Sequence, residues 1–377
     1  MTTARENLVR VFRHERPDWI PIVGHVDPYN QPSRDGMDPQ LAKQLGDVKW
    51  SDQSTLIFSR YLGLDVMDYV SAPLRRIHHN VQATVVADGL DTVTTWHTPL
   101  GELRDVQRRS TTSGASYVVD RLVKTADDLP AYAAIFADET FELDPDAMAT
   151  IDQRRKLIGD DGMLTIFIDG TPLGRTYRTY TTVEDLAYLY ADAPDALGHT
   201  FDVIEENHHR QFALLAQCNA DAFIAIDDTS TTVISPAMFE RYSLDYTNRV
   251  AAIFRDTQRL YIHHSCGLIK DLLPLYRQTA MDGVHAFTVP PIGDVTVAEG
   301  RRLLGDRITI MAGLAPLALD MSDQETAADT IREMFEQAAP GDHFIMNVIA
   351  YPDKTMAQTA FAVAECKKHQ RPPRNRR

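Results

Sequence analysis

His264 and Cys266 are the two residues of this sequence whose types and spacing best suit chemistry. Residues two apart on an extended strand project to the same side, so the imidazole nitrogen and the sulfur can converge on one metal ion or substrate atom. Gly267 follows and lets the backbone turn. Apolar residues at helical spacing between 268 and 275 predict a helix next. The pair is therefore expected where a strand ends and a helix begins.

The strand that carries this pair is one of a series. Short apolar runs alternate with amphipathic segments along the chain, a pattern typical of a parallel sheet that is covered on both faces. Eight such runs occur, at 19–26, 64–70, 163–170, 222–228, 260–266, 284–289, 308–313 and 343–348. Eight βα units in 377 residues predict an α/β fold, a single (β/α)8 TIM barrel over residues 1–370.

Two segments do not follow this rhythm. From about 77 to 123 the chain alternates polar and β-branched residues around the turn sequences 88–89 and 99–101, which predicts antiparallel hairpins inserted into the barrel. The basic, proline-containing tail at 371–377 is predicted to be disordered.

Composition excludes several classes of protein. A formal charge of −15 and a pI near 5.3 argue against a nucleic-acid-binding or anionic-membrane surface. Three cysteines cannot form a disulfide framework and suit a reducing compartment. No apolar run approaches the length of a membrane span, and the first residues are charged and amphipathic, unlike a signal peptide. We therefore expect a cytoplasmic protein without nucleic-acid or membrane partners.

Active sites of such barrels lie at the carboxyl ends of the strands, so the last polar residues of each run are the candidates. We expect catalytic roles for the acids and ligands, and substrate contacts for the others. The candidate catalytic residues are Asp227, Asp228, His264 and Cys266, and the candidate substrate-binding residues are His25, Tyr29, Asp169 and Asn347.

Each candidate also has an ordinary structural interpretation. A lone cysteine such as Cys266 often serves as a small buried hydrophobe. One member of the pair at 227–228 could cap a helix or close a loop, so the minimal expectation is that one of them points inward. Asp169 could form an Asx-turn, and His25 could be a histidine of the barrel wall. The pair at 208–209, in the middle of a predicted helix, is expected on a solvated face.

The order of several short motifs resembles the uroporphyrinogen decarboxylase superfamily, which also contains zinc-dependent methyltransferases that exchange methyl groups with corrinoid proteins. The resemblance covers nearly the whole chain and implies a (β/α)8 barrel. Its marks are Arg-Glu-Asn-Leu at 5–8, Arg-Pro-Asp-Trp-Ile-Pro at 16–21, Thr-Pro-Leu-Gly at 98–101, Lys-Thr at 124–125 with Asp-Asp-Leu at 127–129, Ile-Asp-Asp at 226–228, Ser-Pro-Ala-Met-Phe at 235–239, His-Ser-Cys-Gly at 264–267, and Gly-Asp at 305–306 before a strand that ends in Gly313.

Two branches of the superfamily differ at their sites. The decarboxylase carries an arginine-rich segment with an aspartate after its first strand, whereas this chain has His-Val-Asp-Pro-Tyr-Asn-Gln-Pro at 25–32. The methyltransferase branch is more similar, because its His-x-Cys zinc ligands match His264 and Cys266. Those enzymes usually take another cysteine from just after the last strand. The corresponding stretch here, 346–352, contains no cysteine.

A carboxylate could replace the missing thiolate. Catalytic zinc needs three protein ligands and one open position, and it accepts sulfur, nitrogen and oxygen. The third ligand would be Asp228 or Asp227. An oxygen ligand in place of a thiolate would leave zinc a stronger Lewis acid, suited to polarising an oxygen of a methoxylated substrate.

The resemblance thus implies a corrinoid-dependent methyltransferase or demethylase. It would move a methyl group between a small-molecule methyl donor or acceptor and a corrinoid-binding protein, with zinc at His264, Cys266 and Asp228. The insertion at 77–123 would dock that partner or pair two protomers as a homodimer. Two alternatives remain: a metal-free decarboxylase of a porphyrinogen or another carboxylated small molecule, and a barrel protein without catalysis.

Overall fold

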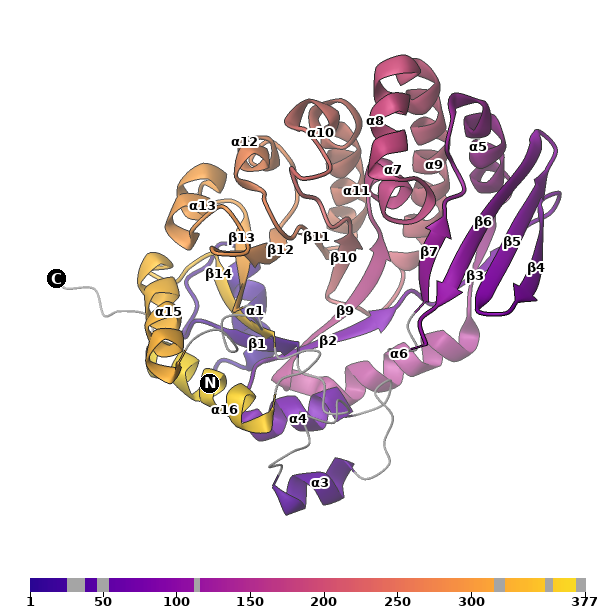
Figure 1. Cartoon of the computed structure of the whole chain (residues 1–377). Helices are drawn as coiled ribbons and strands as arrows, with labels where there is room; N and C mark the ends of the chain where they lie inside the picture. Colours follow the sequence, from indigo (N-terminus) through magenta and orange to yellow (C-terminus); the bar gives the residue numbers. More distant parts are fainter. Residues whose placement is uncertain (26–37, 46–53, 112–115, 315–322, 350–354, 371–377) are drawn as a thin grey trace.

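The structure of the chain is a computed structural model that describes residues 1–25, 38–45, 54–111, 116–314, 323–349 and 355–370. Eight parallel strands form one sheet in the order β1-β14-β13-β12-β11-β10-β9-β2, and the sheet curls into a ring (Figure 1). These strands are β1 (Ile22–His25), β2 (Val66–Ser71), β9 (Gly162–Asp169), β10 (Ala222–Ile226), β11 (Leu260–His264), β12 (Gly283–Thr288), β13 (Thr309–Leu314) and β14 (Phe344–Ile349). The predicted (β/α)8 TIM barrel is confirmed.

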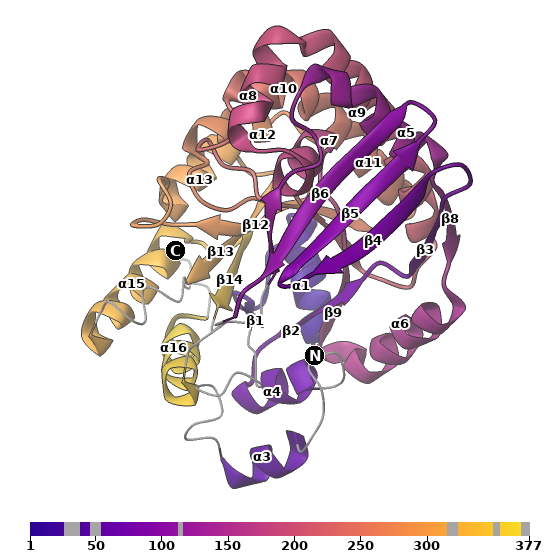
Figure 2. The ribbon, with the colours of Figure 1, turned by 45° about the vertical axis from the view of Figure 1, so that its right-hand side comes forward.

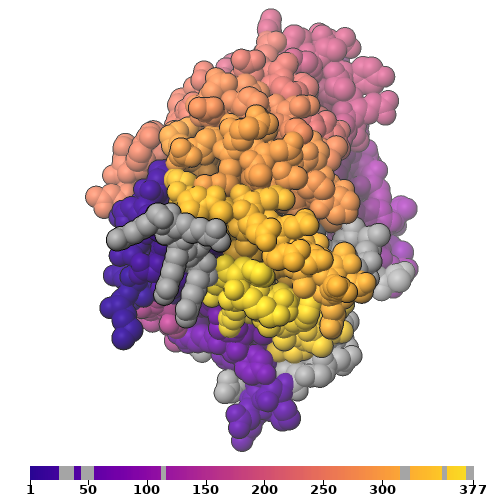
Figure 3. Space-filling model, turned by 90° about the vertical axis from the view of Figure 1, so that its left-hand side faces the viewer, coloured from indigo at the N-terminus to yellow at the C-terminus, as the bar shows by residue number. Residues whose placement is uncertain are grey.

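Helices surround the ring and separate its strands in sequence. They are α1 (Ala4–Phe12), α3 (Pro39–Leu45), α4 (Ser54–Leu62), α5 (Leu129–Asp138), α6 (Pro145–Ile158), α7 (Pro172–Arg175), α8 (Val183–Asp192), α9 (Pro194–Leu215), α10 (Pro236–Tyr242), α11 (Leu244–Asp256), α12 (Leu273–Tyr276), α13 (Val297–Leu304), α15 (Gln324–Gln337) and α16 (Met356–His369). Figure 3 shows the side of the molecule on which the C-terminal part of the chain, in orange and yellow, forms much of the surface. No helix in the described part of the chain is both long and apolar enough to cross a membrane.

The barrel has two apolar layers, because its strands are buried on both faces. The inner layer fills the ring with side chains such as Met67, Ile224 and Ile262. Leu8 and Phe12 of α1 belong to this layer and close the ring at the amino ends of the strands. The outer layer lies between strands and helices. Alternation along each strand therefore decides which residues face the interior.

The predicted antiparallel insertion is also present. Its main part is a four-stranded sheet in the order β4-β5-β6-β7, made of β4 (Gln82–Asp88), β5 (Asp91–Thr98), β6 (Gly101–Arg109) and β7 (Ser116–Asp120). A second, two-stranded sheet pairs β3 (Leu74–Ile77) with β8 (Thr140–Leu143). Figure 2 shows the four-stranded sheet in front of α5 and beside the barrel. The insertion leaves the barrel after β2 and returns before β9.

The helix predicted after Gly267 is present but short. The apolar residues at 268–275 lie in, or just before, two short helical elements. These are a 3₁₀ turn, η4 (Lys270–Leu272), and the four-residue helix α12 that follows it. Pro274, at the second position of α12, is compatible with a first helical turn, but the chain leaves the helix after Tyr276. Burial of Leu272 and Leu273 explains the apolar pattern without a long helix.

Asp65 joins the two ends of the sheet. Its backbone N–H donates to the carbonyl of Ile22 at 2.9 Å, and its carboxylate accepts from the N–H of Ile22 at 2.9 Å. The indole Nε1 of Trp19 lies 3.1 Å from the same carboxylate. Asp65 comes just before β2, while Ile22 opens β1, so this contact brings the first and last strands of the sheet order together.

Asparagine at position 65 tests this anchor. Burial raises the pKa of Asp65 to about 6, although its hydrogen bonds oppose the shift. The folded protein therefore holds the proton of Asp65 more tightly than the unfolded chain does. This difference in proton binding contributes fully to the unfolding free energy below the ordinary pKa of 3.8, and the contribution is lost as the pH rises through 6. We expect wild type to lose about 2 kcal/mol of unfolding free energy relative to Asp65→Asn between about pH 4 and about pH 7.

Urea unfolding of both proteins across that pH range measures the difference. The pKa of Asp282, which burial also raises to about 6, affects both proteins equally and cancels. Parallel stability curves for the two proteins would contradict the assignment.

Candidate metal centre

The end of β10 carries two adjacent carboxylates that point in different directions. Ile226 belongs to the inner layer, so the next residue along the strand, Asp227, lies on the outer side. Its side chain is fully buried and accepts hydrogen bonds from the N–H of Thr171 at 2.7 Å and from the hydroxyls of Thr171 and Thr229 at 2.9 and 2.8 Å. Nε2 of the buried His263 lies 3.4 Å away. Asp227 therefore braces the strand end from outside the barrel.

Gly170 and Gly174 make room for this carboxylate. A Cβ atom at either position would overlap the side chain of Asp227. Tyr177, on the π-helical turn η3 (Thr176–Tyr180), donates its hydroxyl to the main-chain carbonyls of both Asp227 and Asp228, the latter at 2.6 Å. The backbone of both aspartates is thus held by groups that come after β9.

Asp228 turns back toward the barrel mouth. Its backbone lies in the left-handed region, with φ 50°, which costs free energy for any residue with a Cβ and is tolerated best by asparagine and aspartate. One carboxylate oxygen lies 2.9 Å from Nε2 of His264 and 3.9 Å from Sγ of Cys266. Nε of Arg178 lies 2.6 Å from the other carboxylate oxygen. The turn thus points a carboxylate at the predicted His-x-Cys pair.

Asp228, His264 and Cys266 therefore converge. Their ligand atoms all lie within 4.8 Å of one another, and among the described residues this is the one group of three or more such side chains close enough to share a metal ion. Each is only partly exposed. The three residues proposed from the sequence as metal ligands lie together at the carboxyl ends of β10 and β11.

The pair Asp228 and His264 is an ion pair in the metal-free protein. Burial opposes the charge of His264, but hydrogen bonds to Asp228 and Cys266 raise its pKa to about 9. Burial likewise opposes the charge of Asp228, but His264 and Arg178 lower its pKa to about 2. Both groups are charged at neutral pH, so a metal ion must displace a proton from His264.

His285 is a site residue that the sequence analysis missed. Its Nδ1 lies 2.8 Å from Nδ1 of His264, which leaves Nε2 of His264 directed at Asp228. The two histidines face each other in the register of β11 and β12. β12 then shifts register before Phe287, and Ala286 has φ 60°, an irregularity of the kind that re-aims side chains beside functional sites. His285 lies inside β12, so the rule that site residues follow the strand ends did not predict it.

Asp169 lies at the end of β9 but serves a buried arginine. Its carboxylate pairs with Arg175, and Nη2 of Arg76 lies 2.8 Å away. Burial opposes its charge, yet Arg175 and Arg76 hold the pKa of Asp169 well below its ordinary value. Its carboxylate already pairs with two guanidinium groups, and Arg76 also lies 3.5 Å from Glu139, so its geometry favours a structural role over the substrate contact predicted above.

Asn347 lies on the inner register of β14, between Met346 and Val348 of the outer layer. Its side chain is buried, and Oδ1 accepts no hydrogen bond from the described residues. The backbone of His25 ends β1, opposite Ile349, whereas its side chain lies outside the described part of the structure. Tyr29 and the tail at 371–377 also lie outside the described residues.

The prediction of a solvated pair at 208–209 is wrong for His208. This residue is fully buried on α9, and its Nδ1 lies 2.7 Å from the hydroxyl of Tyr246. Its partner His209 is partly exposed and lies 3.4 Å from Glu205. Helical rotation by one residue separates the two environments.

The two remaining cysteines are buried apolar residues. Burial raises the pKa of Cys218 to about 11 and that of Cys366 to about 12.

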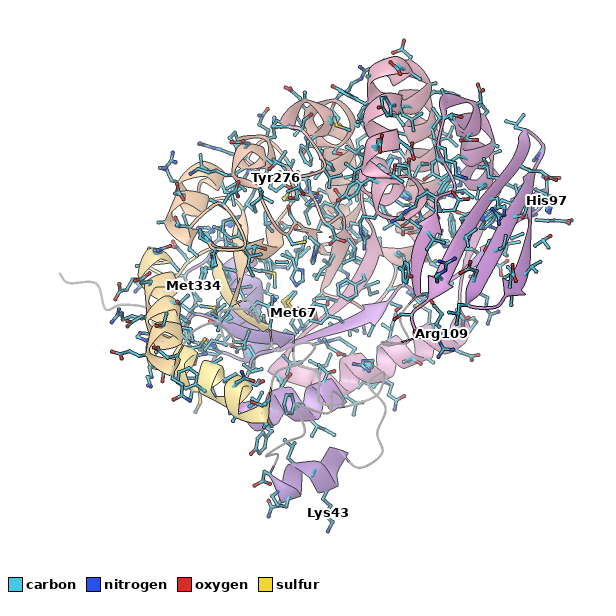
Figure 4. The ribbon with its side chains drawn as sticks, in the orientation of Figure 1. Lys43, Met67, His97, Arg109, Tyr276 and Met334 are labelled. Atoms are coloured by element: carbon cyan, nitrogen blue, oxygen red, sulfur yellow. The ribbon has the colours of Figure 1, made fainter. Side chains whose placement is uncertain are left out.

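Figure 4 labels Met67 inside the ring of strands and Tyr276 among the outer helices, which marks the two sides of the barrel wall. Ser265, between the two ligand candidates, faces outward and lies 2.7 Å from the hydroxyl of Tyr276.

A sequence model described as uroporphyrinogen decarboxylase (URO-D) matches residues 175–365, just over half of the chain. The chain belongs to the uroporphyrinogen decarboxylase family. The matched segment includes Arg178, Asp228, His264, Cys266 and His285. No curated protein matches the chain.

Several solved structures are similar to this chain at low sequence identity. A methyltransferase from Methanosarcina mazei is 15% identical, with 98% of this chain and 99% of that chain covered and a TM-score of 0.60. An endoglucanase from an uncultured bacterium is 10% identical over 60% of this chain and 76% of its own, with a TM-score of 0.38. A xyloglucanase from Paenibacillus pabuli is 10% identical over 60% and 81%, with a TM-score of 0.36. The first likeness shows a common fold over the whole length.

The two adjacent aspartates should respond differently to alanine. Asp227→Ala leaves buried hydroxyls and a buried histidine without their acceptor, so we expect a loss of about 3 kcal/mol or more of unfolding free energy. Asp228→Ala removes partly exposed ion pairs and places alanine at φ 50°, so it should cost about 1–2 kcal/mol, less than Asp227→Ala. Urea unfolding of the metal-free proteins measures both. Equal losses would contradict the division between a bracing and a site-facing carboxylate.

Proposed function

We propose that this protein is a methyltransferase that moves a methyl group between a small-molecule substrate, such as a methoxylated compound, and a corrinoid protein, with the assistance of zinc. The observation that carries the proposal is the convergence of Asp228, His264 and Cys266 at the barrel mouth. Family membership and the whole-length fold likeness to a methyltransferase support it.

The donor set fits zinc. One imidazole nitrogen, one thiol sulfur and one carboxylate oxygen are the three ligand types that zinc takes, and three protein ligands leave a fourth position open for catalysis. His264, Cys266 and Asp228 would hold the ion, which when bound would polarise an oxygen of the substrate and so assist departure of its methyl group. Asp228, which follows β10, would thereby supply the third ligand that the resemblance takes from a cysteine after the last strand.

Neighbouring side chains hold the three donors in place. Arg178 donates from Nε to one oxygen of Asp228 and from Nη1 to the carbonyl of Ile226 at 2.8 Å, which leaves the other carboxylate oxygen toward His264. His285 fixes the ring of His264 through the Nδ1 contact. Hydrogen bonds from such neighbours orient ligands and commonly change metal affinity 10–100-fold, so about that effect is expected from Arg178 and His285.

We expect the substrate at the barrel mouth, against the side chains of the inner layer. Asn347 would bind a hydrogen-bond donor of the substrate with Oδ1. Apolar and aromatic side chains of the inner layer, Tyr69, Phe167 and Ile226, are only partly buried, and the rings of Tyr69 and Phe167 stack at 5.2 Å. An apolar pocket that excludes water is what transfer to a reactive corrinoid requires.

The decarboxylase alternative follows from the description of the matched family. A porphyrinogen carries several carboxylates and would need free cations at the barrel mouth. In the described residues, Arg76 and Arg175 are paired with Asp169, and Arg178 is paired with Asp228. These pairings favour methyl transfer, and the converged donor set argues against a barrel without catalysis.

Metal analysis tests the ligand set. Wild type, reconstituted with zinc and desalted, should retain about one equivalent, as expected for a site with three protein ligands. Asp228→Ala, His264→Ala and Cys266→Ala should each lose the metal under the same conditions. With cobalt(II) in place of zinc, the thiolate charge-transfer band should be absent from Cys266→Ala and present in Cys366→Ala.

Cys366→Ala and His97→Ala are the matched controls, because Cys366 is buried on α16 and His97 lies on the four-stranded sheet, as Figure 4 shows. Both controls should bind as wild type does. A wild type that retains no zinc would overturn the metal centre.

Methyl transfer to free cob(I)alamin tests the activity. Wild type with zinc and a panel of methyl ethers should form methylcobalamin, and Asp228→Ala should be slower by about 100-fold, as for loss of a group that stabilises developing charge. Asp228→Cys should retain zinc but transfer methyl groups from ethers more slowly, because a second thiolate weakens the Lewis acid. Release of carbon dioxide from porphyrinogens by the metal-free protein would instead establish the decarboxylase.

A further inference from the structure

The outermost strand of the four-stranded sheet has one edge without a neighbouring strand. β4 stands at the end of the strand order β4-β5-β6-β7, and all seven of its residues are exposed. Figure 1 shows β4 at the outer margin of the molecule, on the side of the four-stranded sheet away from the barrel. Val85 and Val86 retain 63% and 54% of their accessible surface, which is a high exposure for β-branched apolar residues.

The hairpin turn shows which backbone groups face outward. Asp88 pairs with Asp91 across a two-residue loop whose first residue, Gly89, has φ 63°, the form that a II′ turn requires. Residues that close such a loop exchange hydrogen bonds, and the pattern then alternates along the strand. Ala83, Val85 and Ala87 therefore direct their N–H and C=O groups away from β5. No described residue hydrogen-bonds to these groups.

This edge lacks the usual protection against strand pairing. Exposed edges commonly carry lysine, proline, an inward charge or a bulge. Residues 82–87 contain none of these side chains, and the register of β4 with β5 runs without a break from Gln82 to Asp88. The opposite side of the sheet differs, because the pairing of β6 with the shorter β7 shifts register after Val106.

The sequence of β4 is complementary to itself. In an antiparallel pair centred on Val85, each Val85 would face its copy, and Ala83 would face Ala87, so all outward groups would pair. The charged end residue, Asp88, would face the amide of Gln82 and not another carboxylate. The small alanines avoid clashes beside the central valines, and an interface with the same strand on both sides has the two-fold symmetry of most homodimers.

We propose that β4 is a dimerisation edge, which pairs antiparallel with β4 of a second copy of this chain to form one continuous sheet across a two-fold axis at Val85. On one face of that sheet Val85 would pack against its own copy, and on the other face Val86 would lie opposite Thr84 of the second copy. β4 contributes no residue to the candidate metal centre, so the interface is independent of the chemistry proposed above.

Sedimentation of the full-length protein tests the edge. Wild type should be a dimer at about 10 μM, a concentration well above the dissociation constants of stable homodimers. Val85→Pro removes an outward N–H and Ala87→Lys adds an edge charge, so both should be monomers. Val119→Lys, at an exposed position on β7, is the matched control and should remain a dimer. Unchanged circular dichroism would show that the monomeric variants are folded.

Cross-linking tests the register. Residues that exchange hydrogen bonds across an antiparallel pair have Cα atoms about 5.5 Å apart, within the range of a disulfide. Under mild oxidation Val85→Cys should therefore form a covalent dimer, whereas wild type and Val119→Cys should not. A monomeric wild type would overturn the proposal. So would a dimer that survives both edge variants, or an edge that pairs with a corrinoid protein and not with a second copy.

Discussion

The buried carboxylate of Asp227 is the constraint on which the candidate centre depends. It gathers hydrogen bonds from residues that follow β9 and β10 and lies against a buried histidine of β11. Because that carboxylate is locked outside the barrel, the next residue must reverse direction, and Tyr177 holds the carbonyls on both sides of the reversal. This turn forces Asp228 into the left-handed backbone conformation, which costs free energy. The same turn directs its carboxylate at His264.

Charge pairing then organises the barrel mouth around that carboxylate. Arg178 and His264 approach Asp228 from two sides, and His285 supports the far side of the His264 ring. A second arginine cluster pairs separately with Asp169 and, through Arg76, with Glu139. Several arginines thus lie near the strand ends, but Arg76, Arg175 and Arg178 are already paired with carboxylates of the protein. This is consistent with a site that binds a cation more readily than a polyanionic substrate.

The insertion has a different physical character from the barrel. Barrel strands are buried on both faces and leave few exposed backbone groups, whereas β4 exposes both its side chains and one hydrogen-bonding edge. An open edge of this kind is an aggregation hazard unless something covers it. A second copy would cover it with the same strand, and the candidate metal centres of both barrels would remain accessible to the partner proposed above.

The sequence alone predicted the barrel, the antiparallel insertion and the pair at 264 and 266 with an aspartate at 227 or 228 beside it, because apolar periodicity and strand ends are local properties that the chain shows directly. Only the tertiary structure decided between Asp227 and Asp228, since that choice depends on which carboxylate meets Thr171 from a different strand. The same holds for His285, for the arginines around Asp169 and for the buried position of His208. Contacts between segments far apart in sequence set these environments, and no local pattern records them.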